Sequence, residues 1–388
     1  MKIASVRAAA IRDSSVFRDS SAPRRTWNAG TDSTSALSRY REFVGQGARF
    51  DDPWSDVVCI VTAEDGTWGM GMTKYAGPVV PIINDFFAPF MIGENVFATE
   101  RLWNMMVRVS AARFGAAGLA CYAISAFDLA LWDLKGKLLE RPVYELLGGP
   151  AREEVHCYAT GNDIDWYLEL GFEAIKLCAL HGAANTTRAL SLNETIVAQA
   201  REKVGRDFDL MIDFWPVHDA QFTVELGTRL GQYDLRWIED YLHPEDFRGY
   251  PRVRERLPGQ TLAAGERWYT DRPFDMAASG HWVDIFQPDV QWVGGVTGSL
   301  KVAAIAEAAG IDIAMHAGCN DAYGQHLCYA LPGNRWSEYL VISAPGIDLM
   351  AGYRNTPGMS LPVNGKLVPS DAPGFGIELT LEMLEAAL

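Results

Sequence analysis

The sequence predicts an α/β fold in which a TIM-type barrel follows a smaller module of strands and helices. Between residues 155 and 315, short apolar segments alternate with helical stretches. The segments expected to be strands are 155–159, 174–178, 209–212, 235–238, 262–264, 284–287 and 311–315. This alternation is typical of a parallel sheet, and at least seven such units fit a barrel better than an open sheet of about five or six strands. Several of these segments also end in a carboxylate, as expected at the active-site end of a barrel.

The module before the barrel mixes strand and helix patterns. Residues 56–73 (DVVCIVTAEDGTWGMGMT) form an expected hairpin that turns at Glu64, Asp65 and Gly66. Residues 119–140 have a helical period with one apolar stripe, made of Ala123, Phe127, Ala130, Leu131 and Leu134. The tail after residue 345 is rich in Pro and Gly and lacks the barrel rhythm, so it is expected to fold back onto this first module.

The composition is that of an acidic globular protein. The chain has 388 residues, of which 48% are apolar, and carries a net charge of −15. This charge argues against nucleic-acid binding and against a polybasic membrane contact. The sequence has no apparent signal peptide or membrane-spanning run, and its six dispersed cysteines indicate reduced thiols. A cytoplasmic location is therefore expected.

Three carboxylates end successive strands of the expected barrel. Asp213, Glu239 and Glu266 are 26 and 27 residues apart, which is one strand–helix unit each. Because neighbouring parallel strands end at the same mouth, these side chains should converge there. A divalent cation would relieve their repulsion, and an all-oxygen set suits Mg²⁺, with Mn²⁺ as a possible substitute. The alternative is that each acid is solvated and caps the following helix.

The next two strands supply a candidate proton-transfer pair. Asp289 ends one strand and His316 ends the next, 27 residues later. The carboxylate could accept a hydrogen bond from one ring nitrogen and leave the other nitrogen for catalysis, whereas a structural histidine is the alternative. Lys176 on the second strand could neutralise a substrate carboxylate or could be a surface residue, and His181 follows that strand at the mouth.

These residues, in this order, resemble the enolase superfamily in its mandelate-racemase-like branch. The motifs that carry the resemblance are AISAFDLALWDLKGK (123–137), LLGGP (146–150) and FQPDVQWVGGVT (286–297), together with the three acids and His316. The resemblance implies a modified (β/α)₇β TIM-type barrel with an α+β capping domain formed by both termini. It divides the chain into residues 1–135 (cap), 136–345 (barrel) and 346–388 (a segment that returns to the cap).

Within the branch, the chain resembles the L-rhamnonate dehydratase group through CYATGN (157–162), KLCALHGAA (176–184) and DLMIDFW (209–215). The resemblance implies a Mg²⁺-dependent lyase that removes the C2 proton of an acid sugar and eliminates its 3-hydroxyl, giving a 2-keto-3-deoxy acid. It assigns catalysis to His316, Asp289, Lys176 and Glu338, where Glu338 contacts the substrate carboxylate or enolate and would help to stabilise the ene-diolate if it is protonated. Cys178 stands where related racemases carry a second, basic lysine, and this difference favours dehydration over racemisation.

The substrate is less well defined by the resemblance. Arg267 stands where the group is expected to have a histidine, and HAGCNDAYGQH (316–326) also departs from its pattern, so another acid such as L-lyxonate is an alternative. Candidate substrate-binding residues are Arg267, His181, Arg49 and Arg25, with surface arginines as the alternative for the last two. The rival functions are an epimerase or cycloisomerase that shares the first half-reaction, and a non-catalytic barrel. A homo-oligomer is expected.

Overall fold

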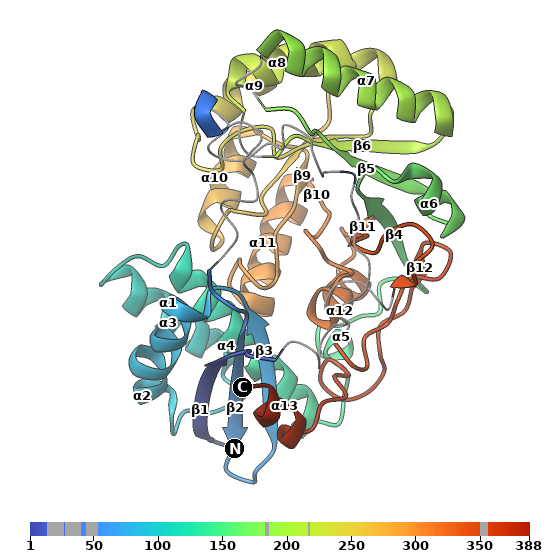
Figure 1. Ribbon diagram of the computed structural model, residues 1–388. Helices are drawn as coiled ribbons and strands as arrows, with labels where there is room; N and C mark the ends of the chain where they lie inside the picture. Colours follow the sequence, from blue (N-terminus) through green and yellow to red (C-terminus); the bar gives the residue numbers. More distant parts are fainter. Residues whose placement is uncertain (14–26, 28–39, 44–52, 183–185, 216–217, 350–355) are drawn as a thin grey trace.

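The computed structural model describes residues 1–13, 27, 40–43, 53–182, 186–215, 218–349 and 356–388. Its N-terminal part is a three-stranded antiparallel sheet in the order β1 (Ile3–Ala10), β2 (Val57–Ala63) and β3 (Trp68–Thr73), so the expected hairpin is confirmed. Helices cover one side of this sheet (Figure 1). They are α1 (Ala76–Pro81), the π-helix η4 (Ile82–Phe87), α2 (Ala88–Met91), α3 (Thr99–Ala111) and α4 (Leu119–Leu138).

Helix α4 is buried on nearly all sides, not along the single stripe that its sequence suggested. It packs against β2 and β3 of the cap and also against α11 (Gly295–Ala309) of the barrel. Gly69 and Gly71 permit this approach, because a β-carbon at Gly71 would lie 2.1 Å from the carbonyl oxygen of Ala126 on α4. The helix therefore joins the cap to the barrel, and this is why both of its faces are apolar.

The central part is a curled parallel sheet, in agreement with the predicted barrel class. Its strands lie in the order β10-β9-β8-β7-β6-β5-β4-β11 and are flanked on the outside by helices (Figure 1). The strands are β4 (Val155–Thr160), β5 (Ala174–Cys178), β6 (Asp209–Asp213), β7 (Ile238–Glu239), β8 (Leu262–Ala264), β9 (Ile285–Phe286), β10 (Asp312–Ile313) and β11 (Ser337–Leu340). The helices are α5 (Val143–Leu146), α6 (Ile164–Glu169), α7 (Thr186–Val204), α8 (Ala220–Leu230), α9 (Gly249–Arg256), α10 (Arg272–Gly280) and α12 (Ala322–Ala330), with short 3₁₀ turns at Arg41–Phe43 and Gly231–Tyr233. All seven strands expected from the periodicity are present, and β11 completes the set of eight.

The last segment contacts both parts. Strand β12 (Lys366–Leu367) pairs antiparallel with β4, and the Phe375 amide donates to Asp133 of α4 at 3.1 Å. Helix α13 (Leu381–Ala387) reaches the cap, where the Arg12 amide donates to the Ala387 carbonyl at 2.9 Å. The proposed divisions at residues 135 and 345 stay predictions.

Two composition-based expectations can be compared with the structure. All six cysteines are buried and free, while their redox state stays a prediction. Across the described ranges, no helix is both long and apolar enough to cross a membrane.

Candidate active site

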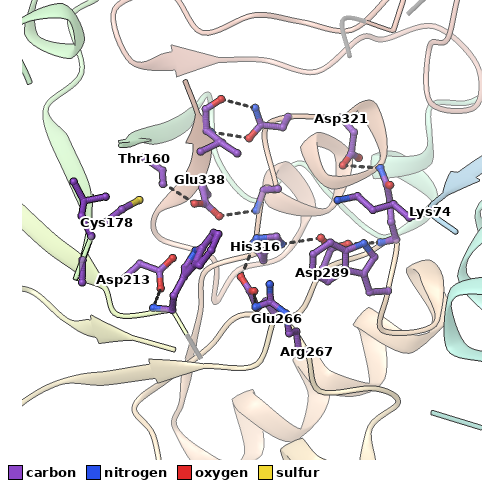
Figure 2. Close-up of a pocket in the computed structure, with 18 of the residues that line it drawn as sticks. Lys74, Thr160, Cys178, Asp213, Glu266, Arg267, Asp289, His316, Asp321 and Glu338 are labelled. Atoms are coloured by element: carbon purple, nitrogen blue, oxygen red, sulfur yellow. Dashed lines mark hydrogen bonds and ion pairs between the residues drawn. The ribbon is translucent and has the colours of Figure 1, made fainter. Parts of the chain in front are cut away.

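The carboxyl ends of the barrel strands surround one pocket, which has a volume of about 250 Å³. Neighbouring strands bring the acids together, since Asp213 on β6 is the register partner of Glu239 on β7. Glu266 follows β8, Asp289 follows β9, and His316 follows β10. Of the predicted site residues, those that line the pocket are Asp213, Glu266, Arg267, Asp289, His316 and Glu338 (Figure 2).

His316 and Asp289 form the pair that their spacing suggested. The Nδ1 atom of His316 lies 2.8 Å from Oδ2 of Asp289, whose other oxygen accepts from the Gln291 amide at 2.7 Å. The Nε2 atom of His316 lies 2.9 Å from Oε2 of Glu266. Burial lowers the pKa of His316, but the hydrogen bond to Asp289 and the charges of Glu338 and Asp289 outweigh burial and raise it above the usual value. The ring is thus oriented by one carboxylate and faces the candidate metal ligands with its other nitrogen.

Lys176 is a core residue, which excludes the surface alternative. Its side chain is 1% exposed, and its ammonium group contacts Glu239 and lies 2.8 Å from Oε1 of Glu338. Burial lowers the pKa of this lysine, but the charges of Glu239 and Glu338 outweigh burial and hold it well above the usual value. Lys176 is therefore held in its charged form by these carboxylates, and it is not among the residues that line the pocket.

The charge state of Glu338 is set by its neighbours. Burial raises the pKa of this carboxyl group, but the charges of Lys176 and His316 outweigh burial and lower the pKa to about 2. The carboxylate accepts hydrogen bonds from Thr160 Oγ1 at 2.6 Å and from the Ala317 amide at 2.7 Å. Two neighbouring cations that are distant in sequence therefore stabilise the charged form of Glu338, whereas its role toward an ene-diolate was conditional on a proton.

The three candidate metal ligands are buried, and each has protein partners. Asp213 accepts from the Trp215 amide at 2.8 Å, and Glu239 accepts from Trp237 Nε1 at 3.1 Å and from the Gln287 amide group. Among the described residues, no three His, Cys, Asp or Glu side chains are drawn together closely enough to hold a metal ion. The three carboxylates would have to move closer together to share a cation.

The chemistry of this set nevertheless fits a divalent metal. Asp213, Glu239 and Glu266 are 5%, 2% and 6% exposed, so their charges are poorly solvated. Burial, followed by the charge of Glu239, raises the pKa of Asp213 to about 7. A cation would remove this unfavourable interaction, and carboxylate oxygens are the donors that Mg²⁺ and Mn²⁺ prefer. These three residues remain our candidates for a metal site.

The candidate substrate-binding residues have different positions. Arg267 lines the pocket and forms ion pairs with Glu266 and Asp240, the latter at 3.3 Å between Nη1 and Oδ2. Its Cζ atom lies 6.0 Å from the centre of the Trp292 ring. His181 follows β5 but does not line the pocket, and its backbone amide donates to Asn193 Oδ1 at 3.2 Å. Arg25 and Arg49 lie outside the described residues.

The structure also places residues in the pocket that the motifs did not identify. Trp292 packs against His316 with ring centroids 4.9 Å apart. It lies within the motif 286–297, but that motif did not assign it a place in the pocket. Lys74 enters from the cap, one residue beyond the hairpin that the sequence suggested. A charged residue directly after a glycine-rich strand was the available signal. The remaining lining residues are Trp27, Thr160, Cys178, Ala179, Leu180, Trp215, Gln291, Ala317, Asn320, Asp321 and Leu340.

Comparison with known proteins is consistent with this geometry. Residues 162–383 match the family model described as enolase C-terminal domain-like, and residues 54–148 match that of the mandelate racemase / muconate lactonizing enzyme N-terminal domain. A curated protein named L-rhamnonate dehydratase, from Saccharopolyspora erythraea, is 35% identical over 352 residues, which cover 89% of each chain.

Solved structures show the same architecture. Rhamnonate dehydratase from Gibberella zeae, complexed with Mg, is 28% identical and matches with a TM-score of 0.90 over 100% of this chain and 96% of that one. The 3,6-anhydro-D-galactonate cycloisomerase from Zobellia galactanivorans is 27% identical, with a TM-score of 0.76 over 100% and 99% of the two chains. The chain therefore belongs to the enolase superfamily, in the branch of mandelate racemase and muconate lactonizing enzyme.

Proposed function

We propose that this protein is a Mg²⁺-dependent dehydratase of an acid sugar of the L-rhamnonate type. The relatives named as L-rhamnonate dehydratases support the reaction class, and the Gibberella zeae structure with Mg supports the cofactor. The observation that carries the proposal is the ion pairing of Lys176 with Glu239 and Glu338, beside a single His316–Asp289 pair. Because Lys176 is charged, the imidazole of His316 is the single group of this pair that can accept a proton.

In the proposed first step, His316 removes the proton from C2 of the substrate. Asp289 holds the ring through Nδ1 and stabilises the imidazolium that forms. Nε2, which lies 2.9 Å from Oε2 of Glu266 in this structure, would leave that carboxylate to accept the proton. Mg²⁺, when held by Asp213, Glu239 and Glu266, would supply positive charge that neutralises the substrate carboxylate. Lys176 adds a buried positive charge behind the same end of the pocket, where it opposes the negative charge that develops on the substrate.

In the second step, the imidazolium of His316 returns its proton to the departing 3-hydroxyl group. The C3–O bond breaks, water leaves, and the resulting enol ketonises to a 2-keto-3-deoxy acid. Glu338, as an anion, accepts hydrogen bonds from Thr160 and from Ala317, so it fixes the backbone beside His316 and does not donate a proton. Both proton transfers occur on one face of the substrate.

An epimerase would need a second proton-transfer group on the opposite face. Cys178 is the pocket residue at the corresponding position, so a thiol stands where the related racemases carry a basic lysine. The similarity to a cycloisomerase shows the shared fold, and a cycloisomerase could share the first step. L-Lyxonate is the alternative dehydration substrate, because Arg267, which lines the pocket, stands where the L-rhamnonate group is expected to have a histidine.

The test is a screen of acid sugars with Mg²⁺ that measures release of a 2-keto acid, starting with L-rhamnonate and L-lyxonate. Each active acid is then incubated in D₂O, and C2 of the recovered substrate is followed by NMR. A dehydratase releases keto acid and returns substrate of unchanged configuration. Inversion or exchange at C2 without loss of water would instead establish an epimerase.

A further inference from the structure

Lys74 is held at the pocket by anchored neighbours on both sides. It directly follows β3, and the hydroxyl group of Thr73 donates to the Gln291 carbonyl of the barrel at 2.8 Å. Tyr75 has a left-handed backbone with φ of 66°, and its ring makes a T-shaped contact with Tyr122 at 4.9 Å. A non-glycine residue keeps this conformation only when its surroundings enforce it. The backbone that carries Lys74 is therefore fixed against the barrel.

Lys74 has different neighbours from those of the other positively charged side chains at the site. Lys176 and Arg267 are both paired with carboxylates. Within the described part of the chain, no carboxylate forms an ion pair with Lys74, whose ammonium group lies 5.2 Å from the centre of the Trp292 ring. A half-buried ammonium group has three donors to satisfy, and at this position they face the pocket.

The place of Lys74 in the pocket indicates which part of a substrate it would meet. Figure 2 shows Lys74 and Asp321 at one end of the pocket, Cys178 and Asp213 at the other end, and His316 between them. This step rests on the proposed function, in which the substrate carboxylate lies at the Asp213 end and C2 and C3 lie beside His316. The rest of the carbon chain then extends toward Lys74.

We propose that Lys74 is a specificity-determining residue that donates hydrogen bonds to hydroxyl oxygens beyond C3 of the substrate. The same end of the pocket contains Asp321, whose Oδ2 atom accepts from Gln291 Nε2 at 3.1 Å and whose Oδ1 atom accepts from the Gly324 amide at 2.7 Å. This end of the pocket therefore has a firmly held carboxylate beside the ammonium group of Lys74. Hydroxyl groups both donate and accept, and they are matched by such a pair. The substrate class is therefore an open-chain acid that carries hydroxyl groups on its distal carbons.

The experiment measures kcat and KM of Lys74→Met and Lys74→Arg with the best acid found in the screen. A hydrogen bond from a charged donor that is present in both ground and transition states mainly affects KM. Lys74→Met should raise KM about 10- to 100-fold with little change in kcat, and Lys74→Arg should restore most of the loss. Lys135→Met is the matched control, because Lys135 also lies over a tryptophan, 4.1 Å from the ring centre of Trp132, but outside the pocket.

The outcomes separate this proposal from the proposed function. Unchanged constants in Lys74→Met, or a fall in kcat at constant KM, would overturn the role of Lys74 while dehydration by the wild type stands. If the wild type dehydrates no acid sugar, the proposed function fails. Calorimetric binding of L-rhamnonate with Mg²⁺ then tests Lys74 by itself: weaker binding by Lys74→Met supports the role, and equal binding or no binding by the wild type overturns it.

Discussion

The Nδ1 atom of His316 lies 2.8 Å from Oδ2 of Asp289, which is the hydrogen-bond distance of an oriented general base. His316→Asn should therefore abolish dehydration, and Asp289→Asn should lower kcat by about 100- to 10,000-fold. Calorimetry should show Mg²⁺ binding in both variants, because the three candidate ligands are intact. The exposed His156→Asn is the control and should keep wild-type kcat. Full turnover by His316→Asn would refute the assigned base.

Gln287 and Trp237 both donate to Oε2 of Glu239, and each is 1% exposed. Such outer partners orient ligands, so Gln287→Leu should weaken Mg²⁺ binding about 10- to 100-fold. The measurement is isothermal titration with MgCl₂. Gln325→Leu is a matched control, because Gln325 is equally buried but donates to Cys319 and Ser360 carbonyls. Equal loss of affinity in both variants would assign the effect to general destabilisation.

Lys176 neutralises two buried carboxylates, Glu239 and Glu338. Removing one partner of a buried ionic group leaves the others uncompensated, so Lys176→Met should lower the free energy of unfolding by about 3–5 kcal/mol. Urea denaturation at pH 7 measures this change. Lys203→Met, which breaks the exposed ion pair with Asp165, should change stability little. A Lys176→Met protein as stable as the wild type would contradict the assigned pairing.

His326 is fully buried, and its Nδ1 atom accepts from the Tyr144 amide at 3.2 Å. Burial lowers the pKa of this histidine to about 4. Because the folded protein holds this ring neutral, the ring makes its full contribution to the free energy of unfolding at pH values above the unfolded pKa of about 6.5. This contribution is lost as the pH falls from there toward 4. Between pH 7 and pH 5 the free energy of unfolding should fall by about 2 kcal/mol more in the wild type than in His326→Gln. Denaturant titrations at the two pH values test this, with the exposed His281→Gln expected to follow the wild type.

Gly71 lies against the backbone of α4, where an added β-carbon would be 2.1 Å from the Ala126 carbonyl oxygen and 2.7 Å from the Ala130 nitrogen. Backbone atoms cannot easily yield, so Gly71→Ala should lower the free energy of unfolding by about 1–3 kcal/mol or more. Gly259→Ala is the control, since no atom lies within 4 Å of its added β-carbon. Thermal and urea unfolding of both variants provide the comparison, and equal stability would show that the cap and α4 can separate.

The barrel and much of its candidate site could be predicted because the sequence patterns that specify them are local and recur in each strand–helix unit. Each strand is a short apolar run, and Asp213, Glu239, Glu266, Asp289 and His316 recur at the same point of successive units. The charge state of Glu338 could not be predicted, because it depends on Lys176 and His316, which come from other strands. Lys74 was missed for a related reason: its position depends on how the cap meets the barrel, and no periodicity encodes that contact.

The close packing of β3 against α4 limits how this pocket can be engineered. Gly69 and Gly71, which lie against α4, and the Thr73–Gln291 hydrogen bond fix the backbone that leads into Lys74. A redesigned cap therefore cannot shift along α4 to accommodate a new ligand. New selectivity would have to come from replacing single side chains at the rim, with the backbone retained as an unchanging frame.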